Sequence, residues 1–183
     1  SFPTRRSSDL VQQAISQVLK PTAKGMVAEK RPFQGILYAG LIQTATGPKV
    51  IEFNARFGDP ETQVVLARLE SPLSEIISSL LAKEQPTIVW NELASVGVVV
   101  AAEGYPNQYK TNLPLPEMSG ETIYYAGVTR SEQALVSAGG RIFLAEATAS
   151  TLEEARKKVY QTLDNYSFPG MYYRKDIGVK GLI

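Results

Sequence analysis

The sequence predicts an α+β fold, with a β-hairpin and its packed helices followed by a small strand-rich domain with one helix. Residues 36–55 carry an alternating hairpin pattern, and apolar residues at three-to-four spacing predict helices before and after it. Several short runs of β-branched and aromatic residues follow residue 93. At 183 residues with 44% hydrophobic side chains, the chain can bury a core as one domain or as two small ones.

The N-terminal residues SFPTRRSSD are polar and basic and lack the apolar centre of a signal peptide. We expect residues 1–9 to be a non-native or disordered terminus. From Asp9 the pattern becomes helical, with Ser8 or Asp9 as N-cap, and Pro21 is expected to break or kink this helix because it lacks an N–H group. A second helical piece is expected to continue through Met26 to Glu29. The apolar positions of the helix are Leu10, Val11, Ala14, Ile15, Val18 and Leu19.

The hairpin is predicted from two strand patterns and a turn. Residues 36–43 fit a buried strand, residues 44–48 form the turn, and residues 49–55 alternate as the return strand. The alternation places apolar and polar side chains on opposite faces. Ile51 and Phe53 point to one face, and Glu52, Asn54 and, if the strand continues, Arg56 point to the other.

The polar face of the return strand carries a carboxylate, an amide and a guanidinium at two-residue spacing. Carboxylate and amide oxygens are hard ligands that suit Mg²⁺ shared with substrate phosphates. Arg56, one step further along, can bind a phosphate or a carboxylate through parallel hydrogen bonds. An alternative stays open from the pattern alone, in which Glu52 and Arg56 form a surface ion pair and Asn54 caps a turn.

Helices are predicted on the C-terminal side of the hairpin. Asp59 can cap the first of them and Pro60 suits its first turn, so the N-terminal N–H groups would favour an anion near the polar face. Together with a metal and an arginine, this describes a phosphoryl-transfer site. Ser71-Pro72 starts a second helix, with Leu73, Ile76, Ile77, Leu80 and Leu81 expected on its inner side. We place a linker over residues 83–92.

The second part of the chain is predicted to be mainly strands. Residues 94–102 form a run typical of a strand buried on both faces, and residues 121–130 and 141–148 are further strands. Thr151-Leu-Glu-Glu154 is a capping box that starts a helix to about Tyr166. We expect the closing segment MYYRKDIGVKG to be a surface tail.

Composition excludes several functions. Nineteen basic and 18 acidic residues give no electrostatic argument for binding nucleic acid or an anionic membrane. With no cysteine there is no disulfide or thiol chemistry, and with no histidine any catalysis must use carboxylates, Lys, Arg or a metal held by oxygen. No apolar run approaches the ~20 residues of a transmembrane helix. Neither GxGxxG nor GxxxxGK[ST] occurs.

The stretch VIEFNARFGDPETQ closely resembles the signature of the phosphoribosylamine–glycine ligase (glycinamide ribonucleotide synthetase) family, of the ATP-grasp superfamily. KPTAKGMVAEKRPFQGILYAGL, SVGVVVAAEGYP and YRKDIG are similar to the same family in the same order, from about Leu10 onward. Other ATP-grasp ligases carry a similar Glu-x-Asn-x-Arg strand, without the following Phe-Gly-Asp-Pro-Glu-Thr-Gln. Residues 1–9 match nothing in the family at this point.

The resemblance implies roles for particular residues. Glu52 and Asn54 would be ligands of Mg²⁺ or Mn²⁺, and Arg56 would lie near the transferred phosphoryl group. Gly58, Asp59 and Glu61 would shape the substrate end. The implied domains are a partial ATP-grasp domain at residues 10–85 and a C-terminal phosphoribosylglycinamide synthetase-type domain at residues 93–183.

The resemblance also implies a function. It is an ATP-dependent ligation of glycine to phosphoribosylamine, giving glycinamide ribonucleotide, ADP and phosphate through glycyl phosphate, in a cytoplasmic enzyme of purine biosynthesis. The family's chain is more than twice as long, so we expect the N-terminal half of the same enzyme to be missing and these residues alone to be inactive. The alternatives are another ATP-grasp carboxylate–amine ligase and a non-catalytic folded module.

Overall fold

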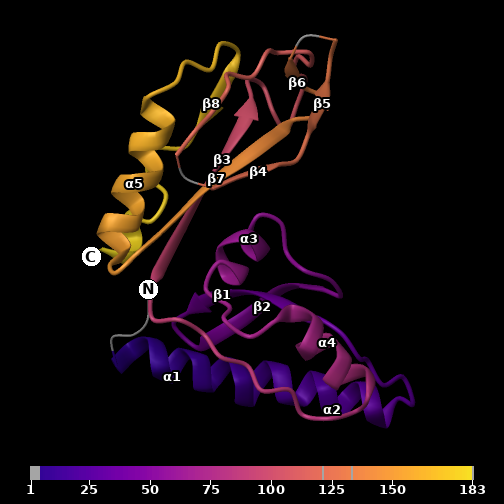
Figure 1. Cartoon of the computed structure of the whole chain (residues 1–183). Helices are drawn as coiled ribbons and strands as arrows, with labels where there is room; N and C mark the ends of the chain where they lie inside the picture. The colour runs from indigo at the N-terminus through magenta and orange to yellow at the C-terminus, as the bar shows by residue number, and fades with distance from the viewer. Residues whose placement is uncertain (1–4, 121, 133, 183) are drawn as a thin grey trace. The chain divides into compact units, whose positions relative to one another are not determined.

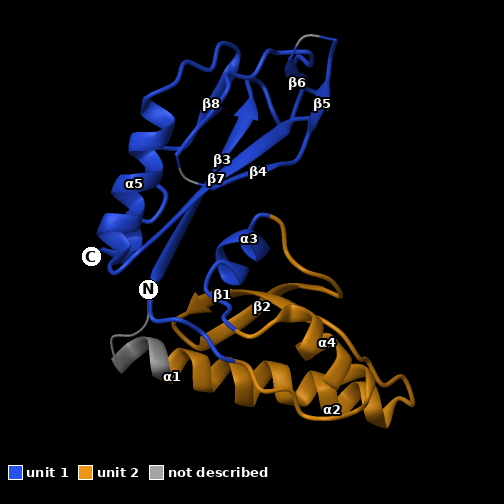
Figure 2. Cartoon of the chain, viewed as in Figure 1, with its two compact units in different colours: residues 1, 60–70, 89–183 blue, residues 2–59, 71–88 orange. Residues whose placement is uncertain are grey.

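A computed structural model describes residues 5–120, 122–132 and 134–182 of the chain (Figure 1). The chain divides into two compact units (Figure 2). Within the described residues, unit 1 comprises residues 60–70, 89–120, 122–132 and 134–182, and unit 2 comprises residues 5–59 and 71–88. The chain therefore passes between the units after Asp59, after Glu70 and after Ile88.

Unit 2 begins with a long helical stretch. It consists of α1 (Arg5–Ala14), the π-helical turn η1 (Ile15–Leu19) and α2 (Lys20–Ala28). The helix starts before the expected Asp9, and the α-helical pattern is interrupted by the π turn just before Pro21 rather than ended by the proline. The second helical piece expected through Met26 is present as α2. Pro21 lies at the first positions of α2, directly after the wider π turn, where a missing N–H is tolerated. Thr22 Oγ1 also donates to the carbonyl of Val18 at 2.8 Å.

The predicted hairpin is present in unit 2. Strands β1 (Tyr38–Thr44) and β2 (Gly47–Asn54) pair antiparallel, and the register shifts between Gly40 and Leu41, which marks a β-bulge. The expected buried strand is wrong, because the apolar side chains of both strands remain accessible within the described residues. Ile42, Ile51 and Phe53 are 52%, 66% and 42% exposed.

Short helices follow the hairpin: α3 (Glu61–Leu66) in unit 1 and α4 (Leu73–Leu81) in unit 2. The N-cap position of α3 is Pro60, one residue later than the expected Asp59. Helix α4 starts where predicted but buries only Ile76, while Ile77 and Leu81, expected inside, are exposed.

Unit 1 is built on a four-stranded sheet with strand order β4-β7-β3-β8, all pairs antiparallel. A separate two-stranded sheet joins β5 to β6. The elements are β3 (Ala94–Ala102), β4 (Thr122–Tyr125), β5 (Val128–Arg130), β6 (Leu135–Ser137), β7 (Arg141–Ala149), α5 (Leu152–Asp164), β8 (Met171–Tyr173) and the 3₁₀ turn η2 (Val179–Gly181).

Helix α5 covers one face of this sheet (Figure 1). On β3 the buried residues alternate with half-buried residues and none is exposed, as expected of a strand that is covered on both faces. The N-cap of α5 is confirmed, because Thr151 Oγ1 accepts a hydrogen bond from the amide of Glu154. The core between sheet and helix includes Val96, Val98, Val100, Ile142, Phe143, Ala155, Val159 and Leu163.

The C-terminal half differs from the sequence expectation in two further places. The strand expected over residues 121–130 is split at residues 126–127 into β4, which pairs with β7, and β5, which pairs with β6. The closing segment is not a surface tail throughout. Its residues Met171–Tyr173 form β8 beside β3, and Met171 is buried.

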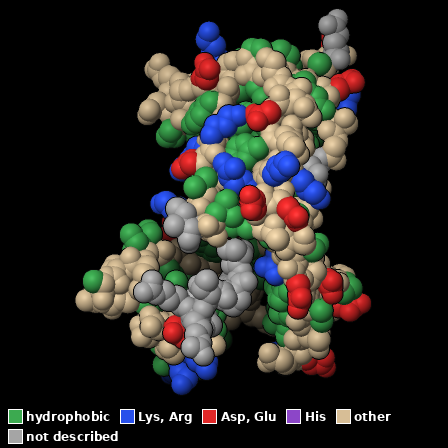
Figure 3. All heavy atoms as spheres, turned by 90° about the vertical axis from the view of Figure 1, so that its left-hand side faces the viewer, with side chains coloured by type: hydrophobic (Ala, Val, Ile, Leu, Met, Phe, Trp, Pro, Cys, Tyr) green, Lys and Arg blue, Asp and Glu red, His purple; other side chains and the backbone are tan. Residues whose placement is uncertain are grey.

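Among the described residues, the longest apolar helices fall short of the length and hydropathy that crossing a bilayer requires. On the described part of the face shown in Figure 3, basic and acidic side chains are interspersed, with hydrophobic side chains exposed among them. Such a mixed surface agrees with the net charge of +1.

Candidate functional site

Glu52 and Asn54 lie together on β2, as predicted. The side-chain amide Nδ2 of Asn54 donates to Glu52 Oε1 at 3.1 Å. Gly40 lies opposite Glu52 on β1, where a Cβ would approach Glu52 Cγ to 3.2 Å. The absence of a side chain at Gly40 thus gives the carboxylate room, beside the bulge of the hairpin.

The chain leaves the strand at Asn54, and the next predicted residues follow in a bend. Arg56 Nη1 donates to the backbone carbonyl of Phe57 at 2.7 Å, so the guanidinium turns along its own loop. The alternative hypothesis, an ion pair between Arg56 and Glu52, is not among the salt bridges of the described residues. Gly58 is buried and Asp59 is exposed.

Glu61 belongs to unit 1, as the first residue of α3, whereas Glu52 to Asp59 belong to unit 2. The predicted site residues are therefore divided between the units. Helix α3 has only six residues and no capping side chain, so it does not support the anion site expected at its N-terminus.

The donors on β2 fit a hard cation in part. A carboxylate and an amide oxygen on one strand face suit Mg²⁺ or Mn²⁺, after rotation of the Asn54 amide to present its oxygen. The described residues contain no cluster of three or more Asp, Glu, His or Cys that could hold a metal alone. A cation here would need further oxygen ligands, such as substrate phosphates.

A pocket of about 420 Å³ lies in unit 1, on the face of the sheet away from α5. It was missed from the sequence, where only the closing RKDIG segment gave a signal. Arginine and tyrosine side chains surround small residues of β3. The lining residues are Pro60, Gly97, Val99, Ala101, Tyr105, Arg141, Tyr172, Arg174 and Ile177.

The segment from Arg174 to Ile177 is fixed by charged pairs. Nε and Nη2 of Arg174 donate to the carboxylate of Asp176 at 2.9 and 2.6 Å, and this hydrogen bonding lowers the pKa of Asp176. Lys175 Nζ donates to Asp164 of α5 at 2.6 Å, and the same hydrogen bond lowers the pKa of Asp164. Lys175 and Arg174 are thus held in different ion pairs.

A carboxylate is buried in the same unit. Glu146 on β7 is 4% exposed and accepts a hydrogen bond from Ser95 Oγ at 2.8 Å. Burial, and then the charge of Glu146, raise the pKa of Tyr124. Glu146 pairs with Gly97 across β7 and β3 but is not among the residues that line the 420 Å³ pocket.

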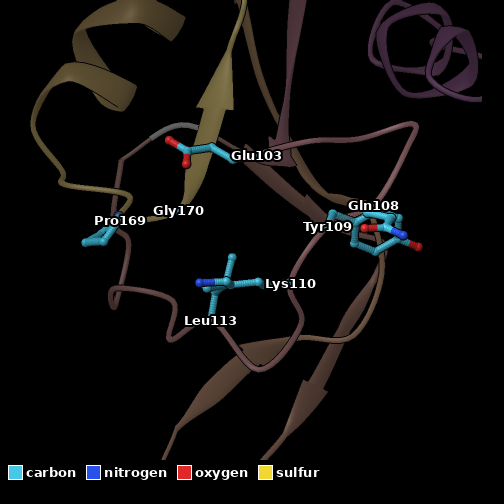
Figure 4. A pocket seen from close by; sticks show the side chains of 7 residues that line it. All are labelled: Glu103, Gln108, Tyr109, Lys110, Leu113, Pro169 and Gly170. Carbon is cyan, nitrogen blue, oxygen red and sulfur yellow. The ribbon is translucent and has the colours of Figure 1, made fainter.

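A second pocket of unit 1, of about 600 Å³, lies beyond the end of β3 (Figure 4). Glu103 follows β3 directly, and Lys110 approaches from the loop that follows it. The lining mixes a carboxylate, an amine and polar side chains, and it includes none of the predicted site residues. Its residues are Glu103, Gln108, Tyr109, Lys110, Leu113, Pro169 and Gly170.

Two domain models of one family match the chain in order. The model described as "Phosphoribosylglycinamide synthetase, ATP-grasp (A) domain" matches residues 3–62, and the "C domain" model of the same synthetase matches residues 95–180. The first match overlaps the segment 1–9 that we had set apart as matching nothing in the family. The origin of that segment stays a prediction.

Similar curated proteins carry the name phosphoribosylamine–glycine ligase. The one from Halalkalibacterium halodurans is 49% identical over 185 residues, which cover 98% of this chain and 43% of the relative. The one from Lactococcus lactis is 49% identical over 179 residues, covering 96% and 43%. The chain therefore spans less than half the length of these relatives.

A solved structure agrees with these matches. The crystal structure of phosphoribosylamine–glycine ligase from Thermotoga maritima superimposes with a TM-score of 0.84 at 29% identity, over 96% of this chain and 44% of that one. This similarity confirms the expected fold class, the C-terminal portion of an ATP-grasp enzyme.

Proposed function

This chain belongs to the phosphoribosylglycinamide synthetase family, and we propose that it is part of an ATP-dependent ligase that joins glycine to phosphoribosylamine. The two domain matches in one chain carry the proposal. The Glu52–Asn54 pair on β2 supports it, because it offers the oxygen donors that phosphoryl transfer with a divalent cation needs. The cytoplasmic location stays a prediction.

The proposed reaction needs an activation step. A carboxylate is a poor electrophile, so ATP phosphorylates glycine to glycyl phosphate, and the amine of phosphoribosylamine then displaces phosphate to give glycinamide ribonucleotide. A neutral amine attacks without a histidine base, in agreement with a chain that has no histidine.

The residues of β2 and its bend take the following roles in this proposal. Glu52 and Asn54 hold Mg²⁺ or Mn²⁺, which neutralises phosphate charge when bound. Arg56 donates hydrogen bonds to the transferred phosphoryl group, after its guanidinium leaves the carbonyl of Phe57. Gly58, Asp59 and Glu61 shape the substrate end.

We further propose that this chain alone does not catalyse the ligase reaction. The chain covers 43% of the length of its relatives. In this proposal the N-terminal half of the enzyme supplies most of the nucleotide pocket and is the partner of this chain. The apolar side chains of β1 and β2 are exposed, which supports the proposal that another part of the enzyme packs against this hairpin of unit 2.

The test is ADP release in the presence of glycine, Mg²⁺ and phosphoribosylamine generated in situ. The chain is assayed alone and mixed with the unmatched N-terminal part of the Lactococcus lactis relative. We expect activity only in the mixture, and we expect Glu52→Gln to lower it about 100-fold or more. Glu84→Gln, which removes an exposed charge from the same unit, is the matched control and should leave the rate unchanged.

Other outcomes would favour the alternatives. ADP release by the chain alone, abolished by Glu52→Gln, would overturn the proposed inactivity. Faster ADP release with another carboxylate than with glycine would favour another ATP-grasp ligase. If the mixture is folded but releases no ADP, a non-catalytic module is favoured.

A further inference from the structure

The 420 Å³ pocket of unit 1 is built on one transverse row of the sheet. Ala101 of β3 pairs with Arg141 of β7 on one side and with Tyr172 of β8 on the other. Residues paired in this way share a sheet face. The methyl group of Ala101 therefore lies low between a guanidinium and a phenol ring, and Gly97 and Val99 continue this shallow floor along β3.

One wall of the pocket is the ring of Tyr105, which is held from two sides. A Cβ at Gly140 would lie 2.1 Å from this ring, so the ring packs directly on the Gly140 backbone. Tyr172 donates its hydroxyl to the carbonyl of Tyr105 at 3.1 Å. Gly140, the residue before Arg141, thus determines the position of the Tyr105 ring in the pocket.

The segment of Arg174 also lines the pocket, and side chains of α5 hold the backbone of this segment. Arg156 donates to the carbonyl of Ile177 at 3.0 Å and to that of Lys175 at 2.7 Å. The hydroxyl of Tyr160 donates to the carbonyl of Arg174 at 2.6 Å. Asp176 orients the Arg174 guanidinium through Nε and Nη2, so the rest of the fork keeps a fixed direction.

The chemistry of the lining selects a class of ligand. Its charged residues are both arginines, and arginine forks match phosphate oxygens. A free amino acid is disfavoured, because the described lining offers no carboxylate to its ammonium group. The rings of Tyr105 and Tyr172 present apolar surface that can cover a small carbon skeleton.

We propose that this pocket binds the phosphate monoester of a small sugar phosphate between Arg141 and Arg174, with the sugar against Tyr105 and Tyr172. Identifying that sugar phosphate with phosphoribosylamine rests on the proposed function. The pocket would then be the site that holds the amine-bearing substrate by its phosphate end.

The test is direct binding of ribose 5-phosphate, which needs neither ATP nor turnover. The chain is titrated by NMR, following the side-chain signals of arginine and tyrosine, with inorganic phosphate and ADP titrated in parallel. We expect ribose 5-phosphate to bind more tightly than either, and Arg141→Gln to weaken it at least about tenfold. Arg130→Gln, the same change at an exposed position of β5, is the matched control and should bind as the parent does.

Variant folding is checked by circular dichroism. If Arg141→Gln does not fold, Arg174→Gln takes its place, since the Arg174 side chain is 67% exposed. Equal weakening by Arg130→Gln, absence of binding, or tighter binding of ADP would each overturn the proposal.

Activity separates this proposal from the proposed function. Binding that depends on Arg141, together with no ligase activity in the reconstituted mixture, would uphold the pocket and refute the ligase. A ligase whose KM for phosphoribosylamine is the same in Arg141→Gln would uphold the ligase and refute the pocket.

Discussion

Gly97 is closely packed on the sheet face that carries the pocket. A Cβ there would lie 2.6 Å from Val64 Cγ1 and 3.1 Å from the side chain of Leu144. Real Cβ atoms do not approach this closely, so any larger residue must displace α3 from β3.

We therefore expect Gly97→Ala to lower the free energy of unfolding by about 1–3 kcal/mol, measured by urea denaturation. Val64→Ala removes the nearest atoms, so in the double variant the loss should be smaller than the sum of the single losses. Strict additivity would show that the contact between α3 and β3 does not carry the effect.

At the residue scale, the sequence predicted which side chains lie together on one strand, but it missed the side chains that come together from different strands. Glu52 and Asn54 share a face because alternate residues of a strand do, and this needs no knowledge of partners. Arg141 and Tyr172 meet on either side of Ala101 only through the pairing register. Thirty residues separate Arg141 from Tyr172 in the chain, and no local pattern joins them.

At the scale of elements, α5 is tied to the segment after β8 by an ionic contact. Asp164 accepts hydrogen bonds from Lys175 Nζ and from the Tyr173 hydroxyl, both at 2.6 Å, and both lower its pKa. A carboxyl with a lowered folded pKa stabilises the fold above its ordinary value of 3.8, and the contribution is lost as pH falls through the folded pKa. The pKa of Lys175 is raised by the same contact, so the stabilisation that its ammonium group contributes is present up to its ordinary pKa of 10.5 and is lost as the pH rises through the folded pKa.

Asp164→Asn should thus destabilise the fold between about pH 5 and pH 9, by at most about 1 kcal/mol for this exposed pair. The difference from the parent should shrink as the pH falls below about 4. Urea denaturation at several pH values measures it, with Glu153→Gln on the exposed first turn of α5 as control. A difference that persists unchanged at low pH would contradict the ionic origin.

Element prediction succeeded where a pattern was long and failed where an element was short. Strand β3 and the capped start of α5 are where the sequence placed them. Strands β6 and β8 have three residues each, too few for a periodic signal. The π turn before Pro21 was missed, because it has no sequence signature that we recognised.

At the scale of the whole molecule, burial is uneven. The large core cluster lies entirely in unit 1, whereas the hairpin of unit 2 exposes apolar side chains on both of its strands. The sequence could not show this uneven burial, because an apolar strand pattern does not reveal whether the element that would pack against the strand is part of the chain. The chain spans only 43% of its relatives, which supports a cover outside these residues.

Hydrogen exchange should follow this division. We expect the amides of Val98, Val100 and Ala145 to exchange slowest and those of β1 and β2 to exchange much faster, because few buried contacts oppose opening of the hairpin. Mass spectrometry of exchanged peptides measures both. Equal protection of the hairpin and the β3–β7 pair would contradict the uneven stability.

The discontinuity of unit 1 also constrains how such a gene can be rearranged. A recombination event at the last crossing, between Ile88 and Val89, would transfer the sheet and α5 but leave α3 behind. The transferred piece would lack α3, the helix that packs on Gly97, and this face of the sheet would become exposed to solvent. Residues 60–70 and 89–183 should consequently be inherited together, so that exchange of this half between related genes succeeds only upstream of Pro60.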